Sequence, residues 1–101
     1  MNTVNYQKVH AQRLARMTPE QRAEYDAAYE HAGLALRLAE LFYDARTAAG
    51  LTQTELARRM GTTQPTIARI EGGGRIPTLD MLERLATAIG MQLDISLTTA
   101  A

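Results

Sequence analysis

Apolar residues recur three and four positions apart through most of the chain, which is the spacing of amphipathic α-helices. The pattern predicts an all-α protein with helices over residues 19–32, 34–49, 52–60, 63–71 and 78–89. A weaker pattern of the same kind (Tyr6, Val9, Leu14, Met17) covers residues 1–17 without strong caps. That first helix is expected to need support from a partner or a dimer mate.

Residues with capping chemistry mark where these helices begin. Thr52 and Glu55 form a capping-box pattern, in which the hydroxyl and the carboxylate each satisfy one free backbone N–H of the first turn. Thr18 precedes Pro19, whose missing N–H costs nothing at a first helical position. The predicted N-caps are Thr18, Thr52, Thr63 and Thr78.

Glycines mark the helix ends, at Gly61, Gly72 and Gly90. Gly33 interrupts the apolar pattern between residues 32 and 34. One glycine costs about 1 kcal/mol relative to alanine inside a helix, which does not decide between a break and a bend. We favour two helices that meet near Gly33 over one bent helix.

The periodicity changes from helical to alternating after Gly90. Met91, Leu93, Ile95 and Leu97 alternate with polar residues, which predicts a strand over 91–98 with one buried face. No other strand is readable in the sequence, so its backbone groups need a strand from another molecule. We expect antiparallel pairing across the two-fold axis of a homodimer; the alternatives are a disordered tail or one that packs back on its own domain.

The stretch TQTELARRMGTTQPTIARIEGG, residues 52–73, predicts two short helices separated by a tight turn. Their inward-facing residues are Leu56, Ala57, Met60, Ile67 and Ile70. The stretch resembles the helix-turn-helix of the XRE family, the lambda-type repressors, and the resemblance extends from Leu34 to about Gly90. It implies a lambda-repressor-like domain over 34–90 that places its second helix in the major groove of double-stranded operator DNA.

The resemblance also implies roles for individual residues. Bases would be read by Thr63, Gln64, Thr66 and Arg69, and Gln53 would contact a phosphate. Apart from the resemblance, the glycine run is expected to let the backbone N–H groups of Gly73 and Gly74, together with Arg75, approach a phosphate. Gln64 is the leading candidate, since its amide can pair with adenine through two hydrogen bonds, whereas Arg69 would prefer guanine. Pro65 departs from the polar residue usual in the family. Arg46 and Glu71 are expected to form a partly buried structural salt bridge.

The glycine run before Arg75 lacks the lysine and hydroxyl residue of a phosphate-binding P-loop, so nucleotide binding is not expected. Its alternative role is that of a plain flexible loop. No cofactor and no small-molecule substrate are expected. His10 and His31 have no carboxylates or cysteines at metal-ligand spacing, so an enzyme and a metal site are not expected, and both histidines are interpreted as surface or interface residues.

Charge separates the candidate DNA-binding segment from the rest of the chain. The 101 residues carry no net charge, but residues 46–75 hold five arginines and two glutamates, a local net charge of +3. A positive segment suits phosphates, and the acidic residues elsewhere suit a basic second partner. Those acidic residues are Glu20, Glu24, Asp26, Glu30, Glu40, Asp44, Asp80, Glu83 and Asp94.

Composition and layout complete the expectation. The chain has no cysteine, no membrane-length apolar run and no signal-like N-terminus, so we expect a cytoplasmic protein without membrane contact. The layout of an extension (1–33), a repressor domain (34–90) and a terminal strand (91–98) resembles HigA-type antitoxins. Such antitoxins repress their own operon and neutralise a small basic RelE/HigB-like toxin. The alternative is a stand-alone phage-type or housekeeping regulator.

Three tyrosines are candidates for binding the toxin: Tyr25, Tyr29 and Tyr43. Tyrosine suits interfaces because its ring is apolar and its hydroxyl is polar. The alternative interpretation is that these rings pack in the core or cover it.

Overall fold

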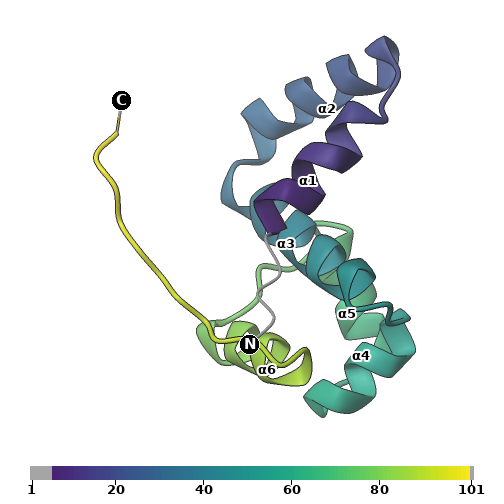
Figure 1. Cartoon of the computed structure of the whole chain (residues 1–101), viewed down its shortest axis with the longest axis vertical. Coiled ribbons are helices and arrows are strands. Elements are labelled where there is room, and N and C mark those ends of the chain that lie inside the picture. Colours follow the sequence, from purple (N-terminus) through teal and green to yellow (C-terminus); the bar gives the residue numbers. More distant parts are fainter. Residues whose placement is uncertain (1–5, 101) are drawn as a thin grey trace.

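The computed structural model describes the backbone of residues 6–100 and the side chains of residues 8–30 and 33–100. Within that range the protein is all-α, as predicted, and Figure 1 shows the arrangement of its helices. They are α1 (Tyr6–Ala15), α2 (Pro19–Ala32), α3 (Leu34–Ala48), α4 (Gln53–Met60), α5 (Gln64–Glu71) and α6 (Leu79–Ala88). The weak N-terminal pattern is helical from Tyr6 onward, and residues 1–5 lie outside the described part. Among the described helices, none is both long enough and apolar enough to cross a membrane.

Threonine caps begin four of the helices at the predicted positions. The hydroxyls of Thr18, Thr52, Thr63 and Thr78 each accept the backbone N–H three residues further on. Full capping boxes form at the starts of α2 and α4, because the side chains of Gln21 and Glu55 also accept the backbone N–H groups of Thr18 and Thr52. The hydrogen bonds from the backbone N–H and hydroxyl of Thr52 lower the pKa of Glu55. Local sequence therefore sets these helix starts.

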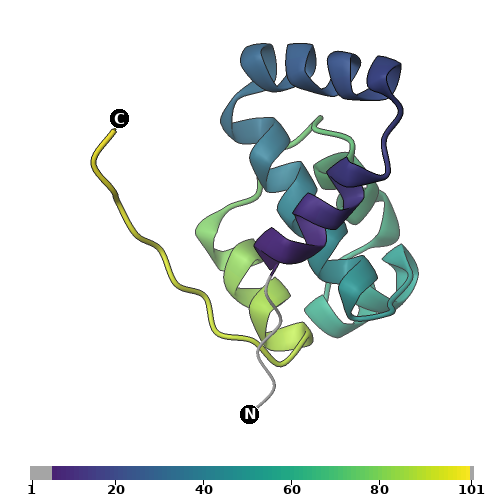
Figure 2. The same ribbon diagram turned by 45° about the horizontal axis from the view of Figure 1, so that its top comes forward.

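Gly33 separates α2 from α3, so the expectation of two helices is confirmed. Its φ of 55° and ψ of −124° lie in a region that L side chains rarely adopt. The chain turns there, and Figure 2 shows α2 running across one end of α3. The α1–α2 hairpin thereby folds back along α3, and α1 packs against it.

The core lies between α3, α4, α5 and α6. Phe42, Leu56, Ile67 and Ile70 are completely buried, and burial of each such side chain stabilises the fold by about 1.5–3 kcal/mol. All five inward residues predicted for α4 and α5 are buried. Periodicity over residues 78–89 also predicts an inward-facing Leu79, but this first residue of α6 is 65% exposed. Met81 takes the inward position instead.

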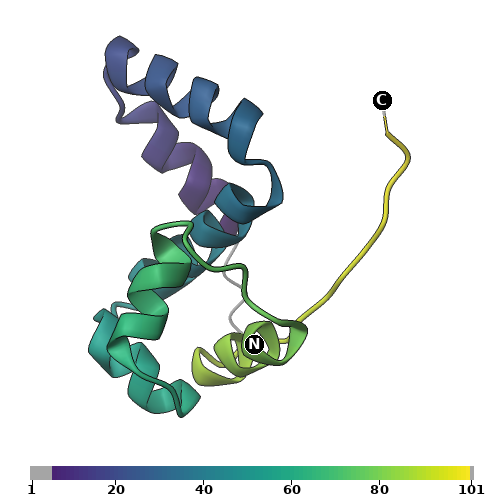
Figure 3. The ribbon, with the colours of Figure 1, turned by 180° about the vertical axis from the view of Figure 1, so that it is seen from behind.

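The hairpin and the helix-turn-helix occupy different ends of the molecule. Figure 3, from behind, shows α1 and α2 together at one end, with α4 and α6 at the other. Helix α3 joins the two ends, since it contacts α1, α2 and α5. Helix α3 therefore connects the hairpin to α5.

The predicted strand over 91–98 is absent from the single chain. Residues 91–100 run away from α6 without regular secondary structure (Figure 1). A strand needs a neighbouring strand for its backbone hydrogen bonds, and residues 6–90 offer none. Met91 and Leu93 remain half-buried against the domain, whereas Ile95 is 62% exposed and Leu97 is fully exposed.

Candidate nucleic-acid interface

The α4–α5 unit is a tight helix-turn-helix. Gly61 ends α4 in the left-handed conformation with φ 70°, and its N–H donates to the carbonyls of Ala57 and Arg58. Thr63 then caps α5, with Pro65 in the first turn. The inner faces of both helices enter the core, so the outer face of α5 is left at the surface.

The four residues predicted to read bases lie on the accessible part of α5. Thr63, Gln64 and Arg69 are exposed, and Thr66 is half-buried. The hydroxyls of Thr63 and Thr66 lie 2.9 Å apart and pair with each other. Because these two hydroxyls are partly engaged by the cap, Gln64 and Arg69 are the long polar side chains that this face offers to a ligand.

Gln64 is held by a neighbouring amide. Its Nε2 donates to Oε1 of Gln53 over 2.8 Å, and Gln53 Nε2 donates to Oε1 of Glu71 over 3.2 Å. The sequence suggested that Gln53 contacts a phosphate, but its side chain lies between α5 residues in the described structure. Gln64 keeps one N–H and its carbonyl oxygen for a further partner.

Arg46 and Glu71 lie together as a two-pronged ion pair. Arg46 Nε lies 2.7 Å from Glu71 Oε2, and its Nη2 lies 2.9 Å from Oε1. A third bond runs from Nη1 to the carbonyl of Leu51, and the two side chains are only 13% and 6% exposed. The hydrogen bonds to Glu71 raise the pKa of Arg46 against the opposing effect of burial. The pair ties α3 to the end of α5.

The glycine loop after α5 uses its backbone donors internally. The Gly73 N–H donates to the carbonyl of Ile70 over 3.1 Å, and the Gly74 N–H to that of Arg69 over 2.9 Å. Gly73 adopts φ 77°, as this helix ending requires. Since both predicted phosphate-binding amides already serve α5, Arg75, which is exposed, is the group of this loop best placed to meet a phosphate.

The arginines of this segment divide between structure and surface. Arg46 is tied to Glu71, and Arg59 reaches the carbonyl of Ala88 on α6 over 3.3 Å. Arg58, Arg69 and Arg75 are exposed. The surface of the helix-turn-helix is therefore basic within a neutral chain.

A polar cluster that the sequence did not predict joins the hairpin to α3. The hydroxyl of Tyr25 donates to both carboxylate oxygens of Glu40, at 2.9 and 2.8 Å. Arg13 donates to the same carboxylate over 2.5 Å and to Asp44 over 3.0 Å. His10 Nδ1 lies 3.2 Å from Asp44 as well. Glu40 and Asp44 are buried, so these two acids hold the hairpin instead of facing a basic partner.

The cluster shifts the acid–base behaviour of its members. Burial and the hydrogen bond to Glu40 raise the pKa of Tyr25 well above its usual range. Burial alone would lower the pKa of Arg13, but hydrogen bonds to Asp44 and Glu40 outweigh it and raise the pKa. Both groups therefore stay protonated at neutral pH. His10, interpreted from the sequence as a surface or interface residue, is half-buried in this cluster between α1 and α3; the side chain of His31 lies outside the described part.

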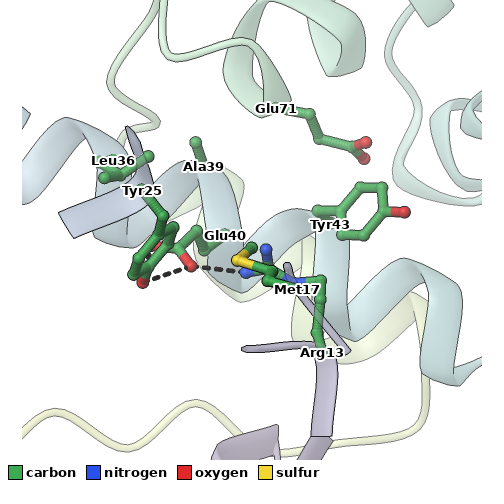
Figure 4. A pocket seen from close by; sticks show the side chains of 8 residues that line it. All are labelled: Arg13, Met17, Tyr25, Leu36, Ala39, Glu40, Tyr43 and Glu71. Carbon is green, nitrogen blue, oxygen red and sulfur yellow. Dashed lines mark hydrogen bonds and ion pairs between the residues drawn. The ribbon is translucent and has the colours of Figure 1, made fainter. Parts of the chain in front are cut away.

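A mainly apolar pocket of about 340 Å³ lies beside the cluster (Figure 4). It is open to solvent between the hairpin, α3 and the end of α5. Its lining residues are Arg13, Met17, Tyr25, Leu36, Ala39, Glu40, Tyr43 and Glu71. Of the three tyrosines proposed for partner binding, Tyr25 is half-buried in the cluster, whereas Tyr29 and Tyr43 are 41% and 42% exposed.

Comparison with known proteins agrees with this geometry. The model of the family described as "Helix-turn-helix" matches residues 42–96. An uncharacterized HTH-type transcriptional regulator of Methanothermobacter thermautotrophicus is 42% identical over 52 residues, which are 52% of this chain and 75% of that protein. No solved structure gives a significant match. On the matched span and on the α4–turn–α5 geometry, the chain belongs to the helix-turn-helix family of DNA-binding transcriptional regulators, which are not enzymes.

Proposed function

We propose that this regulator reads a specific operator through Gln64 and represses transcription as a homodimer. The observation that carries the proposal is the exposed Gln64 amide, which Gln53 holds at the first turn of α5. A second helix of this kind docks in the major groove with its N-terminal residues at base edges. One free N–H and one carbonyl oxygen are the groups needed to pair with N7 and N6 of adenine.

Arg69 and Arg75 complete the interface. Arg69 is exposed on the same helix and can pair with guanine, and Arg75 can neutralise a phosphate after the helix ends. The paired hydroxyls of Thr63 and Thr66 offer weaker hydrogen bonds nearby. On this assignment Gln64 and Arg69 set sequence preference, and Arg75 adds affinity for any duplex.

The C-terminal segment supports a homodimer. Ile95 and Leu97 expose large apolar side chains to water in the single chain. Because such exposure is unfavourable, it favours a tail that packs against another molecule. An apolar groove of about 240 Å³ lies between α3, α6 and the start of the tail, lined in part by Leu41, Leu82 and Ile89. In the proposed dimer the strands over 91–98 of two copies pair antiparallel, with Met91, Leu93, Ile95 and Leu97 facing the grooves. Two recognition helices then meet operator half-sites about one helical turn apart.

Helix α2 favours an antitoxin role as the finer function. Of its side chains in the described range, only Tyr25 is half-buried, and the others are exposed. They include Glu20, Glu24, Asp26 and Glu30 against Arg22, a net charge of −3. An exposed acidic helix carrying Tyr29 suits a small basic protein such as a RelE/HigB-like toxin, with the segment 1–33 as its binding region. The alternative is a stand-alone regulator in which this arm only supports the dimer.

The test combines DNA binding, oligomeric state and partner capture. Full-length protein is titrated onto duplex DNA from upstream of its own gene, with a shuffled duplex as control, and its mass is measured by sedimentation. A dimer that prefers its own upstream duplex supports the repressor. A monomer with equal affinity for both duplexes contradicts it. Co-expression with the neighbouring gene decides the finer point, since a bound basic protein supports the antitoxin and its absence supports the stand-alone regulator.

A further inference from the structure

Tyr43 on α3 lies within reach of two arginines from different parts of the chain. The guanidinium carbon of Arg13, on α1, is 5.7 Å from the centre of its ring, and that of Arg46 is 5.5 Å away. Both distances fall in the range of cation–π attraction. Figure 4 shows the ring between the side chain of Arg13 and the carboxylate of Glu71. Tyr43 thus links the hairpin to Arg46, whose ion-pair partner Glu71 is the last residue of α5.

Side-chain hydrogen bonds continue from Arg46 to α5, the helix proposed to read bases. Arg46 holds Glu71 at 2.7 and 2.9 Å, and Glu71 accepts from Gln53 at 3.2 Å. Gln53 in turn accepts from Gln64 at 2.8 Å. Each of these side chains has several rotatable bonds, so each needs a neighbour to keep it in one rotamer.

Arg13, at the α1 end of this series of contacts, is held in place by two carboxylates. It donates to Glu40 over 2.5 Å and to Asp44 over 3.0 Å, and both carboxylates belong to buried residues of α3. Tyr43 therefore stands between one immobilised guanidinium on the hairpin and another that orients Glu71. The series of contacts from α1 to Gln64 has no gap in the described structure.

We propose that Tyr43 is a positioning residue for operator reading: its ring holds Arg46 and thereby keeps Glu71, Gln53 and Gln64 in the arrangement that discriminates bases. The inference rests on the proposed role of Gln64. This role requires no contact of Tyr43 with DNA, since its link to Gln64 runs through Arg46, Glu71 and Gln53. Tyr43 affects which base is preferred at the operator position that Gln64 reads, because a polar side chain held in one arrangement pairs well with fewer bases.

The aromatic face carries the effect and the hydroxyl does not. Tyr43→Phe keeps the ring over both arginines, whereas Tyr43→Leu keeps apolar volume without the ring's negative face. Tyr29→Ala is a matched control, because Tyr29 on α2 is 41% exposed and Tyr43 is 42% exposed. Tyr29 contacts Tyr25, with ring centres 6.0 Å apart, and lies away from Arg46.

The experiment measures base preference at every operator position. Wild type selects its operator from random duplexes, and the affinity of each variant is then measured on all single-base substitutions of that operator. Tyr43→Leu and Tyr43→Ala are expected to lower the preference at the Gln64 position by roughly three- to tenfold, with Tyr43→Phe and Tyr29→Ala unchanged. Melting curves identify any variant that unfolds. If Tyr43→Ala unfolds, the test uses Tyr43→Leu, which keeps more of the apolar volume.

Gln64→Ala separates failure of the inference from failure of the proposed function. If it relaxes one position and Tyr43→Leu leaves that position unchanged, the positioning role is wrong and the reading role stands. If Tyr43→Leu weakens all sequences equally, Tyr43 is only structural and the inference is also wrong. If Gln64→Ala relaxes no position, the proposed reading by Gln64 fails and the inference falls with it.

Discussion

Gln53 and Gln64 are eleven residues apart in sequence, yet their side-chain amides form one hydrogen bond of 2.8 Å across the helix-turn-helix. Gln53 begins α4 and Gln64 begins α5, so the bond joins the first turns of the two helices. Because Gln53 also donates to Glu71, the first turn of α5 is connected to its last residue through a side chain of α4. The side chain of Gln53 on α4 therefore supports the surface of α5 proposed to face DNA.

Removing the Gln64 amide should affect base choice more than stability. Gln64→Ala is expected to cost about 1–3 kcal/mol of binding on the cognate operator and to relax one base position, because it removes the amide proposed to pair with adenine. Gel-shift titrations on the cognate and substituted duplexes measure this. Gln12→Ala is the matched control, since Gln12 is exposed on α1, and unchanged discrimination by Gln64→Ala would contradict the assignment.

Glu71→Ala should destabilise the fold strongly. The change leaves the partly buried Arg46 without its carboxylate and removes an acceptor from Gln53, so we expect a loss of about 3 kcal/mol in the free energy of unfolding. Asp26→Ala is the matched control, because it breaks an exposed pair with Arg22 and should cost less than about 0.5 kcal/mol. Urea titrations compare the two. Equal losses would show that the Arg46–Glu71 pair is energetically unimportant.

Arg75→Gln should weaken binding to all duplexes alike. If Arg75 neutralises one phosphate, its loss lowers the slope of log affinity against log salt by about one without changing sequence preference. Affinities on cognate and shuffled DNA at several salt concentrations give this slope. Arg22→Gln on α2 is the control and should leave it unchanged. A loss confined to the cognate duplex would instead place Arg75 at a base.

Tyr25 should make stability fall at alkaline pH. Its pKa is raised in the folded state by burial and by its hydrogen bond to Glu40, while in the unfolded chain it ionises near its ordinary value of about 10. The stabilising effect is therefore present below pH about 10 and is lost as the pH rises above it. Tyr25→Phe should show a shallower alkaline decline than wild type in urea titrations. Tyr29→Phe, which lies outside the polar cluster, should decline like wild type.

Leu97→Asp should weaken the proposed dimer. Leu97 is fully exposed in the single chain, so a charge there should leave the folded monomer intact and act only where the side chain becomes buried. Sedimentation at several concentrations should show dissociation at higher protein concentration than for wild type. Thr98→Asp, the neighbouring exposed residue on the other face of the predicted strand, is the control. Identical behaviour of both variants would argue against pairing of the tails.

Local rules in the sequence predicted the helices and the helix-turn-helix well. A threonine cap acts on the N–H three residues later, and a glycine ends a helix in place, so both are readable without knowing the rest of the fold. Thr52 with Glu55 and Gly61 at the end of α4 are examples. The inward residues of α4 and α5 followed from periodicity for the same reason.

The polar cluster of the hairpin could not be predicted in that way. Arg13 lies 27 and 31 residues from its two carboxylates, so no local pattern connects them. From the sequence, Glu40 and Asp44 are expected among the acidic residues that suit a basic partner, whereas the folded-back hairpin contacts both and they are buried. The terminal strand does not form in the single chain for a related reason, because alternation shows which side chains share a face but supplies no pairing partner.

The positive φ at Gly33 makes the placement of the N-terminal hairpin depend on one residue. A residue with a Cβ would be strained at φ 55°, whereas the described buried hydrophobic residues all lie within residues 39–86. One codon change could thus shift the hairpin, and with it Arg13 beside Tyr43, without altering a core side chain. Mutation at this single position therefore offers a way to adjust the hairpin separately from the core.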